Sequence, residues 1–159
     1  MKVLKKKEKN YGIGIAVAGA ERRKSPTWNA CVAEVFVDPD TGIVDVKKLT
    51  YAIDCGTIIN RDGALAQVEG SALFGLSMAL HEELEFTDGG FPQKNFNEYK
   101  MLRLKDAPEI EVELIETGGQ PVGLGVALSV HFGGQGMPLG ALGVQLVPGP
   151  PRRISPAPF

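Results

Sequence analysis

The stretch at residues 51–80 reads YAIDCGTIINRDGALAQVEGSALFGLSMAL and contains the longest helical pattern of the chain. Asn60 is a good helix N-cap, because its side chain can accept a hydrogen bond from a free backbone amide of the first turn. After it, apolar side chains recur at spacings of three and four residues, which is typical of the buried face of a helix. They are Leu65, Val68, Ala72, Leu76 and Ala79. We therefore expect a long helix that begins directly after Asn60.

Short apolar or alternating runs on both sides of this helix are typical of strands. The expected strands span residues 12–18, 28–37, 43–53, 82–86 and 109–115. A turn around Pro39 and Gly42 joins the second strand to the third, which predicts a β-hairpin. In the last strand Ile110, Val112 and Leu114 should face one way. Strands in mixed order with one long packed helix predict an α+β fold, a two-layer mixed sheet covered by that helix.

The composition of the chain changes sharply near Thr117. All 19 acidic residues precede it, whereas 10 of the 20 glycines and 7 of the 11 prolines follow from that point on. Backbone-breaking residues at this density make a long helix or strand hard to form. We expect a basic tail at residues 1–10, a folded part at 11–125 and an irregular Gly/Pro-rich tail at 126–159.

Charge and cysteine content narrow the classes of function. A net charge of −2 gives no general attraction to nucleic acid, and no run of about 18 apolar residues exists that would span a membrane. Cys31 and Cys55 are too few for a disulfide framework. With His81 and His131 far apart in sequence, a zinc site has no local support. We expect Cys31 and Cys55 to be two buried free thiols.

The glycine-rich segments do not match a nucleotide-binding pattern. After Gly12 and Gly14, a dinucleotide fingerprint would need a third glycine where Val17 stands.

We expect the tail from Val126 onward to be out-of-frame or foreign sequence. The alternative is a functional loop in which the glycines of residues 133–136 cradle an anion.

One group of residues on the expected helix suggests a ligand. Gln67, Gly70 and Ser71 stand at positions i, i+3 and i+4, so they should share one face of the helix. An amide without bulky neighbours would let a large ligand approach the backbone closely. The alternative is that Gly70 only allows close packing of the helix on the sheet.

Residues 51–80 resemble a segment of the large subunit of xanthine-oxidase-type molybdenum hydroxylases, such as isoquinoline oxidoreductases, nicotinate dehydrogenases and aldehyde oxidoreductases. In that family a strand ending in Asp-x-Gly leads to an Asn-containing turn and then to AQ-x-EGG on a helix. The matching residues here are Asp54, Gly56, Asn60, Ala66, Gln67, Glu69 and Gly70, with Ser71 in place of the second glycine. The stretches NFNEYKMLRLKDAPEIEVELIE (residues 95–116) and PVGLG (residues 121–125) resemble two further family segments. The resemblance covers roughly residues 11–125, as a fragment of a molybdenum-cofactor-binding domain.

The resemblance implies a molybdopterin cofactor, commonly in its cytosine dinucleotide form. The partners of this chain would be the remainder of the large subunit and a small subunit with 2Fe–2S clusters. The reaction it implies is hydroxylation of an N-heterocycle or an aldehyde with oxygen from water. Carried over onto this chain, the cofactor-binding residues would be Gln67, Gly70, Ser71, Gly123 and Gly125, none of them a metal ligand. The expected location is the cytoplasm, or the periplasm if the full subunit carries an export signal.

The chain departs from the family pattern directly after residues 121–125. Family members carry a glutamate there that acts as general base, whereas this chain has Val126. Valine cannot accept a proton, so we expect a fragment without a catalytic residue that is inactive alone. The alternative is a non-catalytic assembly or interaction module that kept the fold and lost the cofactor.

Overall fold

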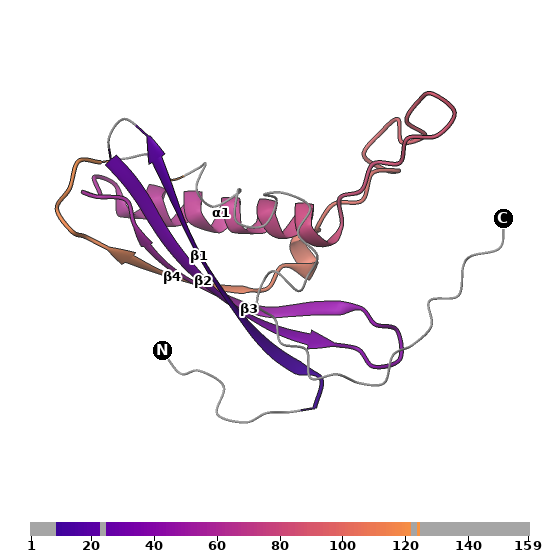
Figure 1. Cartoon of the computed structure of the whole chain (residues 1–159), viewed down its shortest axis with the longest axis horizontal. Coiled ribbons are helices and arrows are strands. Elements are labelled where there is room, and N and C mark those ends of the chain that lie inside the picture. The colour runs from indigo at the N-terminus through magenta and orange to yellow at the C-terminus, as the bar shows by residue number, and fades with distance from the viewer. Residues whose placement is uncertain (1–8, 23–24, 122–123, 125–159) are drawn as a thin grey trace.

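A computed structural model of the chain describes residues 9–22, 25–121 and 124, which form two layers (Figure 1). One layer is a four-stranded sheet in the order β1-β2-β3-β4, and the other is the helix α1. The elements are β1 (Tyr11–Arg22), β2 (Ser25–Val37), β3 (Val44–Asp54), α1 (Arg61–Leu80), the short 3-10 helix η1 (Leu104–Asp106) and β4 (Glu109–Ile115). The first three strands are antiparallel neighbours, and β4 runs parallel to β3. The predicted α+β fold with a mixed sheet and one packed helix is confirmed, while the predicted tail at 126–159 lies outside the described residues.

The predicted hairpin forms from β2 and β3. The Asp38 carboxylate accepts hydrogen bonds from the backbone amides of Asp40 and Thr41, at 2.8 and 3.2 Å. Gly42 then reverses the chain at a φ of 75°, a conformation that glycine adopts without steric cost. β1 and β2 are longer than predicted, because the two strands stay paired as far as Arg22 and Ser25.

The helix begins where the sequence predicts. The Asn60 side chain accepts a hydrogen bond from the Gly63 amide at 3.0 Å, which caps the first turn. Seven residues of α1 are buried along one side: Ala64, Val68, Ser71, Ala72, Gly75, Leu76 and Ser77. No helix within the described ranges combines the length and the apolar character needed to cross a membrane.

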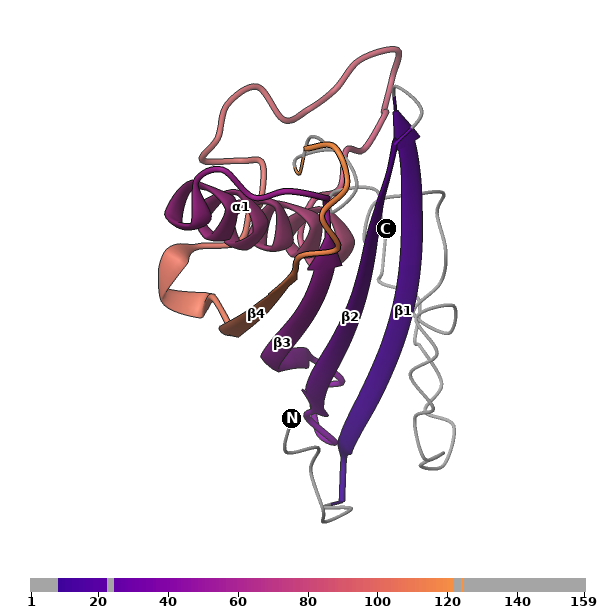
Figure 2. The same ribbon diagram turned by 90° about the vertical axis from the view of Figure 1, so that its left-hand side faces the viewer.

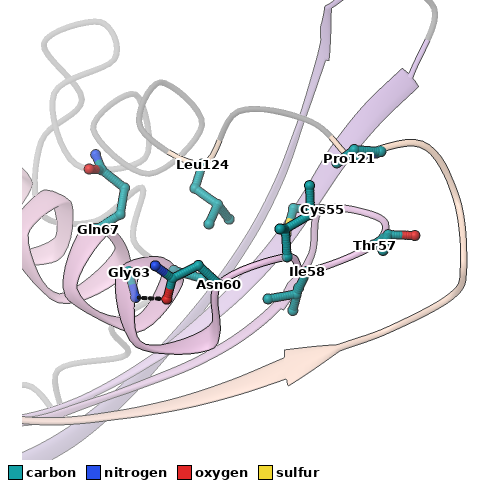
Figure 3. Close-up of a pocket in the computed structure, with 10 residues that line it drawn as sticks. Cys55, Thr57, Ile58, Asn60, Gly63, Gln67, Pro121 and Leu124 are labelled. Carbon is teal, nitrogen blue, oxygen red and sulfur yellow. Dashed lines mark hydrogen bonds between the residues drawn. The ribbon is translucent and has the colours of Figure 1, made fainter.

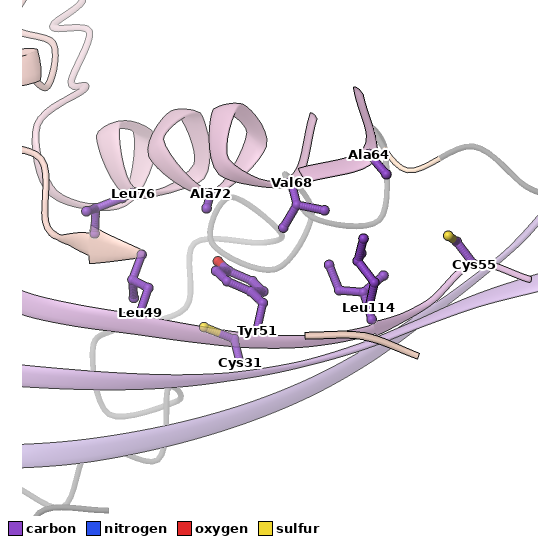
Figure 4. Close-up of a cluster of buried hydrophobic side chains, with 10 residues drawn as sticks. Cys31, Leu49, Tyr51, Cys55, Ala64, Val68, Ala72, Leu76 and Leu114 are labelled. Atoms are coloured by element: carbon purple, nitrogen blue, oxygen red, sulfur yellow. The ribbon is translucent and has the colours of Figure 1, made fainter. Parts of the chain in front are cut away.

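The core lies between α1 and the sheet (Figure 4). From the sheet it receives Cys31, Leu49, Tyr51, Ile53 and Leu114, and from the helix Ala64, Val68, Ala72 and Leu76. Leu49, Tyr51, Ile53 and Val68 are completely inaccessible to solvent. Ile110, Val112 and Leu114 all point to this side of β4, as predicted. Since β3 supplies three of the five core side chains that have no exposed area, Ala72 being the fifth, this strand is the centre of the fold.

The predicted strand at residues 82–86 does not form. Leu84 and Phe86 are 58 and 68% exposed, and the only pairing in this region is a bridge between Thr87 and Gly90. The alternating pattern was misleading here because no neighbouring strand is available to pair with it among the described residues. Part of the segment between α1 and η1 instead forms an arm that projects beyond the end of α1 (Figure 1), and the chain returns at Leu102, which packs against the core.

The two cysteines are buried free thiols, which confirms that prediction. Cys31 lies opposite Tyr51 across the β2–β3 pair, with the Cys31 side chain in the core. Burial raises the pKa of the Cys31 thiol to about 11, and it also raises the pKa of the Tyr51 hydroxyl. Both groups therefore stay neutral in the folded chain at physiological pH.

The raised pKa of Cys31 predicts a loss of stability at alkaline pH. Above pH 9 the thiol releases its proton in the unfolded chain, whereas in the folded chain it keeps the proton up to about pH 11. Rising pH therefore stabilises the unfolded state relative to the folded state. Between pH 9 and 10 this effect should lower the free energy of unfolding of the parent by about 1 kcal/mol. A Cys31→Ala variant has no thiol at this position, so its free energy of unfolding should not show this decrease. Urea unfolding of both proteins at pH 9 and at pH 10 measures this difference. An equal change in unfolding free energy between the two pH values in parent and variant would contradict the prediction.

Candidate functional site

An open hollow of about 450 Å³ lies at the N-terminal end of α1 (Figure 3). Its size falls within the range of small-molecule sites. The lining residues are Cys55, Thr57, Ile58, Ile59, Asn60, Gly63, Ala64, Gln67, Pro121 and Leu124. They come from the loop after β3, the first turns of α1 and the segment after β4, so the hollow joins three parts of the chain.

Two loops are tied together beside this hollow by contacts among five residues, which we call the loop clamp. These residues are Asp54, Gly56 and Thr57 at and after the end of β3, and Thr117 and Gly119 after β4. The backbone amide and the hydroxyl of Thr57 both donate to the Gly119 carbonyl oxygen, at 2.9 and 2.8 Å. The Thr117 hydroxyl donates to the Asp54 carboxylate at 3.0 Å. The two loops meet because β3 and β4 are parallel neighbours whose carboxyl ends lie at the same end of the sheet.

Gly56 makes the close approach of these loops possible. Its φ is 76°, and the Asp54 carboxylate accepts a hydrogen bond from its amide at 3.0 Å. A Cβ at this position would stand 2.2 Å from the Gln120 carbonyl oxygen. Only glycine therefore lets residues 119–120 lie against this turn, from where the chain continues to Pro121 and Leu124 in the wall of the hollow.

The three helical residues predicted to bind a cofactor are separated by the structure. Gln67 is exposed and lines the hollow. Ser71 is buried, and its hydroxyl donates to the carbonyl oxygens of Gln67 and Val68 at 2.8 and 3.0 Å. Gly70 lines a different hollow of about 300 Å³, together with Phe74 and Leu102. The expectation that all three share one accessible face is wrong, because Ser71 points toward the sheet.

The alternative that Gly70 allows close packing on the sheet is also wrong. Gly70 is exposed, and a Cβ there would meet nothing within 4 Å. The remaining predicted positions, Gly123, Gly125 and Val126, lie outside the described residues, so their roles stay predictions.

Sequence reasoning missed the loop clamp. Asp54 and Gly56 stand out in the sequence only as part of a family motif, Thr117 only as the point where the composition changes, and Thr57 not at all. The signal was the Asp-x-Gly-Thr order at residues 54–57, because an Asp two residues before a Gly commonly accepts from the following backbone. Its partner loop is more than 60 residues away, and no local pattern points to it.

The hollow suits an uncharged planar group. None of the described side chains that line it carries a charge. The side-chain amide of Gln67 makes no hydrogen bond to the described residues, so it is available to a ligand. Apolar walls such as Ile58 and Leu124 with one free amide fit a heterocyclic ring, whose edge carries donors and acceptors. The described residues contain no group of three His, Cys, Asp or Glu side chains placed to hold a metal ion directly.

Comparison with known families gives a match over most of the folded part. The molybdopterin cofactor-binding domain matches residues 4–108. A membrane-bound aldehyde dehydrogenase (pyrroloquinoline-quinone) from Gluconacetobacter polyoxogenes is 44% identical over 117 residues, which is 74% of this chain and 15% of that protein. The isoquinoline 1-oxidoreductase subunit beta of Brevundimonas diminuta is 34% identical over 113 residues, 71% of this chain and 14% of that protein.

Solved structures share the fold. Quinoline 2-oxidoreductase from Pseudomonas putida 86 superposes with a TM-score of 0.64 at 23% identity, covering 69% of this chain and 15% of that one. The Cu,Mo-CO dehydrogenase gives a TM-score of 0.63 at 21% identity, covering 68% of this chain and 14% of that one. In each comparison this chain spans only a small part of the relative's length.

Proposed function

Since the chain belongs to the molybdopterin cofactor-binding domain family, we propose that it forms part of the large subunit of a xanthine-oxidase-type molybdenum hydroxylase. The observation that carries this proposal is the hollow at the start of α1, whose free Gln67 amide and apolar walls fit a pterin or a nucleobase. Relatives named as oxidoreductases over the same segment support it. Because the chain spans 15% or less of these relatives, the activity would belong to an assembly with the rest of the subunit.

The proposed assembly hydroxylates an N-heterocycle or an aldehyde with oxygen from water and passes the electrons to a 2Fe–2S partner subunit. The cofactor, in its cytosine dinucleotide form, supplies the redox chemistry when bound. In this chain Gln67 donates to and accepts from the edge of its ring system, while Ile58 and Leu124 exclude water. The loop clamp holds the wall of the hollow in place. The proposed division of the chain remains a basic tail at 1–10, a cofactor-binding part at 11–125 and a tail at 126–159, in a cytoplasmic protein.

Replacing Gln67 by leucine is expected to lower the affinity for the cofactor about fivefold, because loss of the side-chain amide removes on the order of 1 kcal/mol of hydrogen bonding. The variant is made in the chain co-expressed with the remaining segments of a large subunit. Molybdenum and pterin content per mole of protein are then measured. Glu69→Leu is the matched control, since Glu69 is also exposed on α1 but does not line the hollow. Equal cofactor content in the two variants would contradict the role of Gln67.

Val126 favours a second candidate function. With valine at the position where the family carries its general base, the chain would serve as a non-catalytic assembly or interaction module. Protein purified together with its natural neighbours separates the two functions. Detection of molybdenum and pterin supports the hydroxylase subunit, and detection of neither supports the module.

A further inference from the structure

The outer edge of the sheet is an open strand. β1 lies at the end of the strand order, and no described residue pairs with it on the side away from β2. Natural proteins usually protect such an edge with charged side chains, proline or a bulge. Residues 11–20, YGIGIAVAGA, contain neither a charge nor a proline, and the β1–β2 pairing runs without a register shift. This edge is therefore able to accept another strand.

The two faces of β1 differ in side-chain size. Ala16 lies opposite Cys31, whose side chain is in the core, so the even-numbered residues of β1 face the α1 side of the sheet. These are the small residues Gly12, Gly14, Ala16 and Ala18. The odd-numbered residues face the open side, where Ile15 and Val17 are 64 and 69% exposed. An added strand would thus meet apolar side chains on the open face and only glycines and alanines on the α1 face.

We propose that two copies of this chain pair antiparallel through β1, with Ile15 opposite Ile15 of the second copy. In this register Ile13 lies opposite Val17 of the second copy, so three apolar cross-strand pairs form on the open face. On the α1 side Gly12 lies opposite Ala18, and Gly14 opposite Ala16, which fit without collision. The result is one continuous eight-stranded sheet.

Aromatic side chains fit the ends of the same register. Tyr11 lies opposite Gly19 of the second copy, a position with no side chain of its own. The Trp28 ring lies over Gly19, since a Cβ there would stand 2.4 Å from the ring, and Trp28 is 54% exposed. Tyr11 of one copy thus meets Trp28 of the other. A shift of the two-fold axis to Ala16 would leave Ile13 opposite Gly19 and Tyr11 opposite Glu21.

The sequence of β1 favours a second copy over an unrelated strand. The apolar side chains of Ile13, Ile15 and Val17 are arranged symmetrically about Ile15, as a self-pairing strand requires, and residues 11–20 offer no charge for recognition of a different partner. Among the described residues no helix lies at the β1 edge, because α1 lies over β3 and β4 near the other edge of the sheet (Figure 2).

Single cysteines test the register in the full chain. Opposite residues of an antiparallel pair have Cα atoms about 4.5–5.5 Å apart, within reach of a disulfide. Under mild oxidation Ile15→Cys should form a covalent dimer by itself. Ile13→Cys or Val17→Cys alone should give at least about tenfold less dimer, since like positions are offset by roughly 14 Å. Mixing these two variants should restore the cross-link. Equal cross-linking of all three single variants, or none with Ile15→Cys, would overturn the proposal.

Sedimentation tests the association itself. The parent chain should sediment at twice its 17.0 kDa mass, and Ile15→Lys should sediment as a monomer with unchanged helix content. Ile43→Lys is the control, because Ile43 is 66% exposed in the β2–β3 turn, away from the β1 edge. A monomeric parent chain, or loss of the dimer in the control as well, would show that β1 is not the interface.

Discussion

Replacing Gly56 by alanine is expected to lower the free energy of unfolding by about 3 kcal/mol. The left-handed backbone at a φ of 76° costs a non-glycine residue about 1–2 kcal/mol. The new Cβ would also stand 2.2 Å from the Gln120 carbonyl oxygen, so the second loop must move away. That movement breaks the hydrogen bonds from Thr57 to Gly119, each contributing about 1 kcal/mol.

Gly42→Ala is the matched control for this experiment. Gly42 has nearly the same φ, 75°, but a Cβ there would meet nothing within 4 Å. Its replacement should therefore cost only the backbone part, about 1–2 kcal/mol. Urea unfolding of the full chain measures both values. Equal losses in the two variants would mean that the loop clamp contributes nothing to stability.

Replacing Val68 by aspartate is expected to abolish cooperative folding at neutral pH, with a loss of about 5 kcal/mol. Val68 is completely inaccessible and faces the sheet between Ala64 and Ala72 (Figure 4). The core cluster to which it belongs is apolar, and no lysine or arginine among the described residues is buried. The helix would have to leave the sheet to hydrate the charge.

The far-ultraviolet circular dichroism of Val68→Asp should accordingly lose most of its helical signal. Ala66→Asp provides the control, because Ala66 is exposed two residues earlier on the same helix. Its unfolding free energy should change by less than about 0.5 kcal/mol, as is usual for a surface substitution. Partial recovery of helix in Val68→Asp near pH 4, where the carboxyl begins to take up a proton, would support the stated cause. A cooperative transition like that of the control would contradict it.

Features set by neighbouring residues were predictable from the sequence. The Asn60 cap, the apolar spacing through Val68 and Leu76, and the turn before Gly42 are all determined within a few residues, and each forms as expected. The strand expected at 82–86 shows the limit of this reasoning. Alternation indicates that a segment is able to pair, but only a neighbour distant in sequence decides whether it does.

The candidate site was predictable only in part for the same reason. Gln67 could be selected from its position on the helix, and it does line the hollow. The opposite wall comes from Pro121 and Leu124, which the parallel pairing of β3 with β4 brings there. The orientation of Ser71 depends on which side of α1 meets the sheet. Helical spacing alone did not distinguish its buried position from the exposed position of Gly70.

The placement of β4 bears on how the chain folds during its synthesis. β1, β2 and β3 follow one another along the chain, whereas contacts such as Lys48 to Glu109 join residues 61 positions apart. Strands connected over such distances pair more slowly than hairpins. On the ribosome the three-stranded meander would emerge well before β4, with the β3 backbone edge and Leu114's place in the core still uncovered. A nascent chain at this stage is an aggregation-prone intermediate, and a chaperone that binds unpaired strands would act on it.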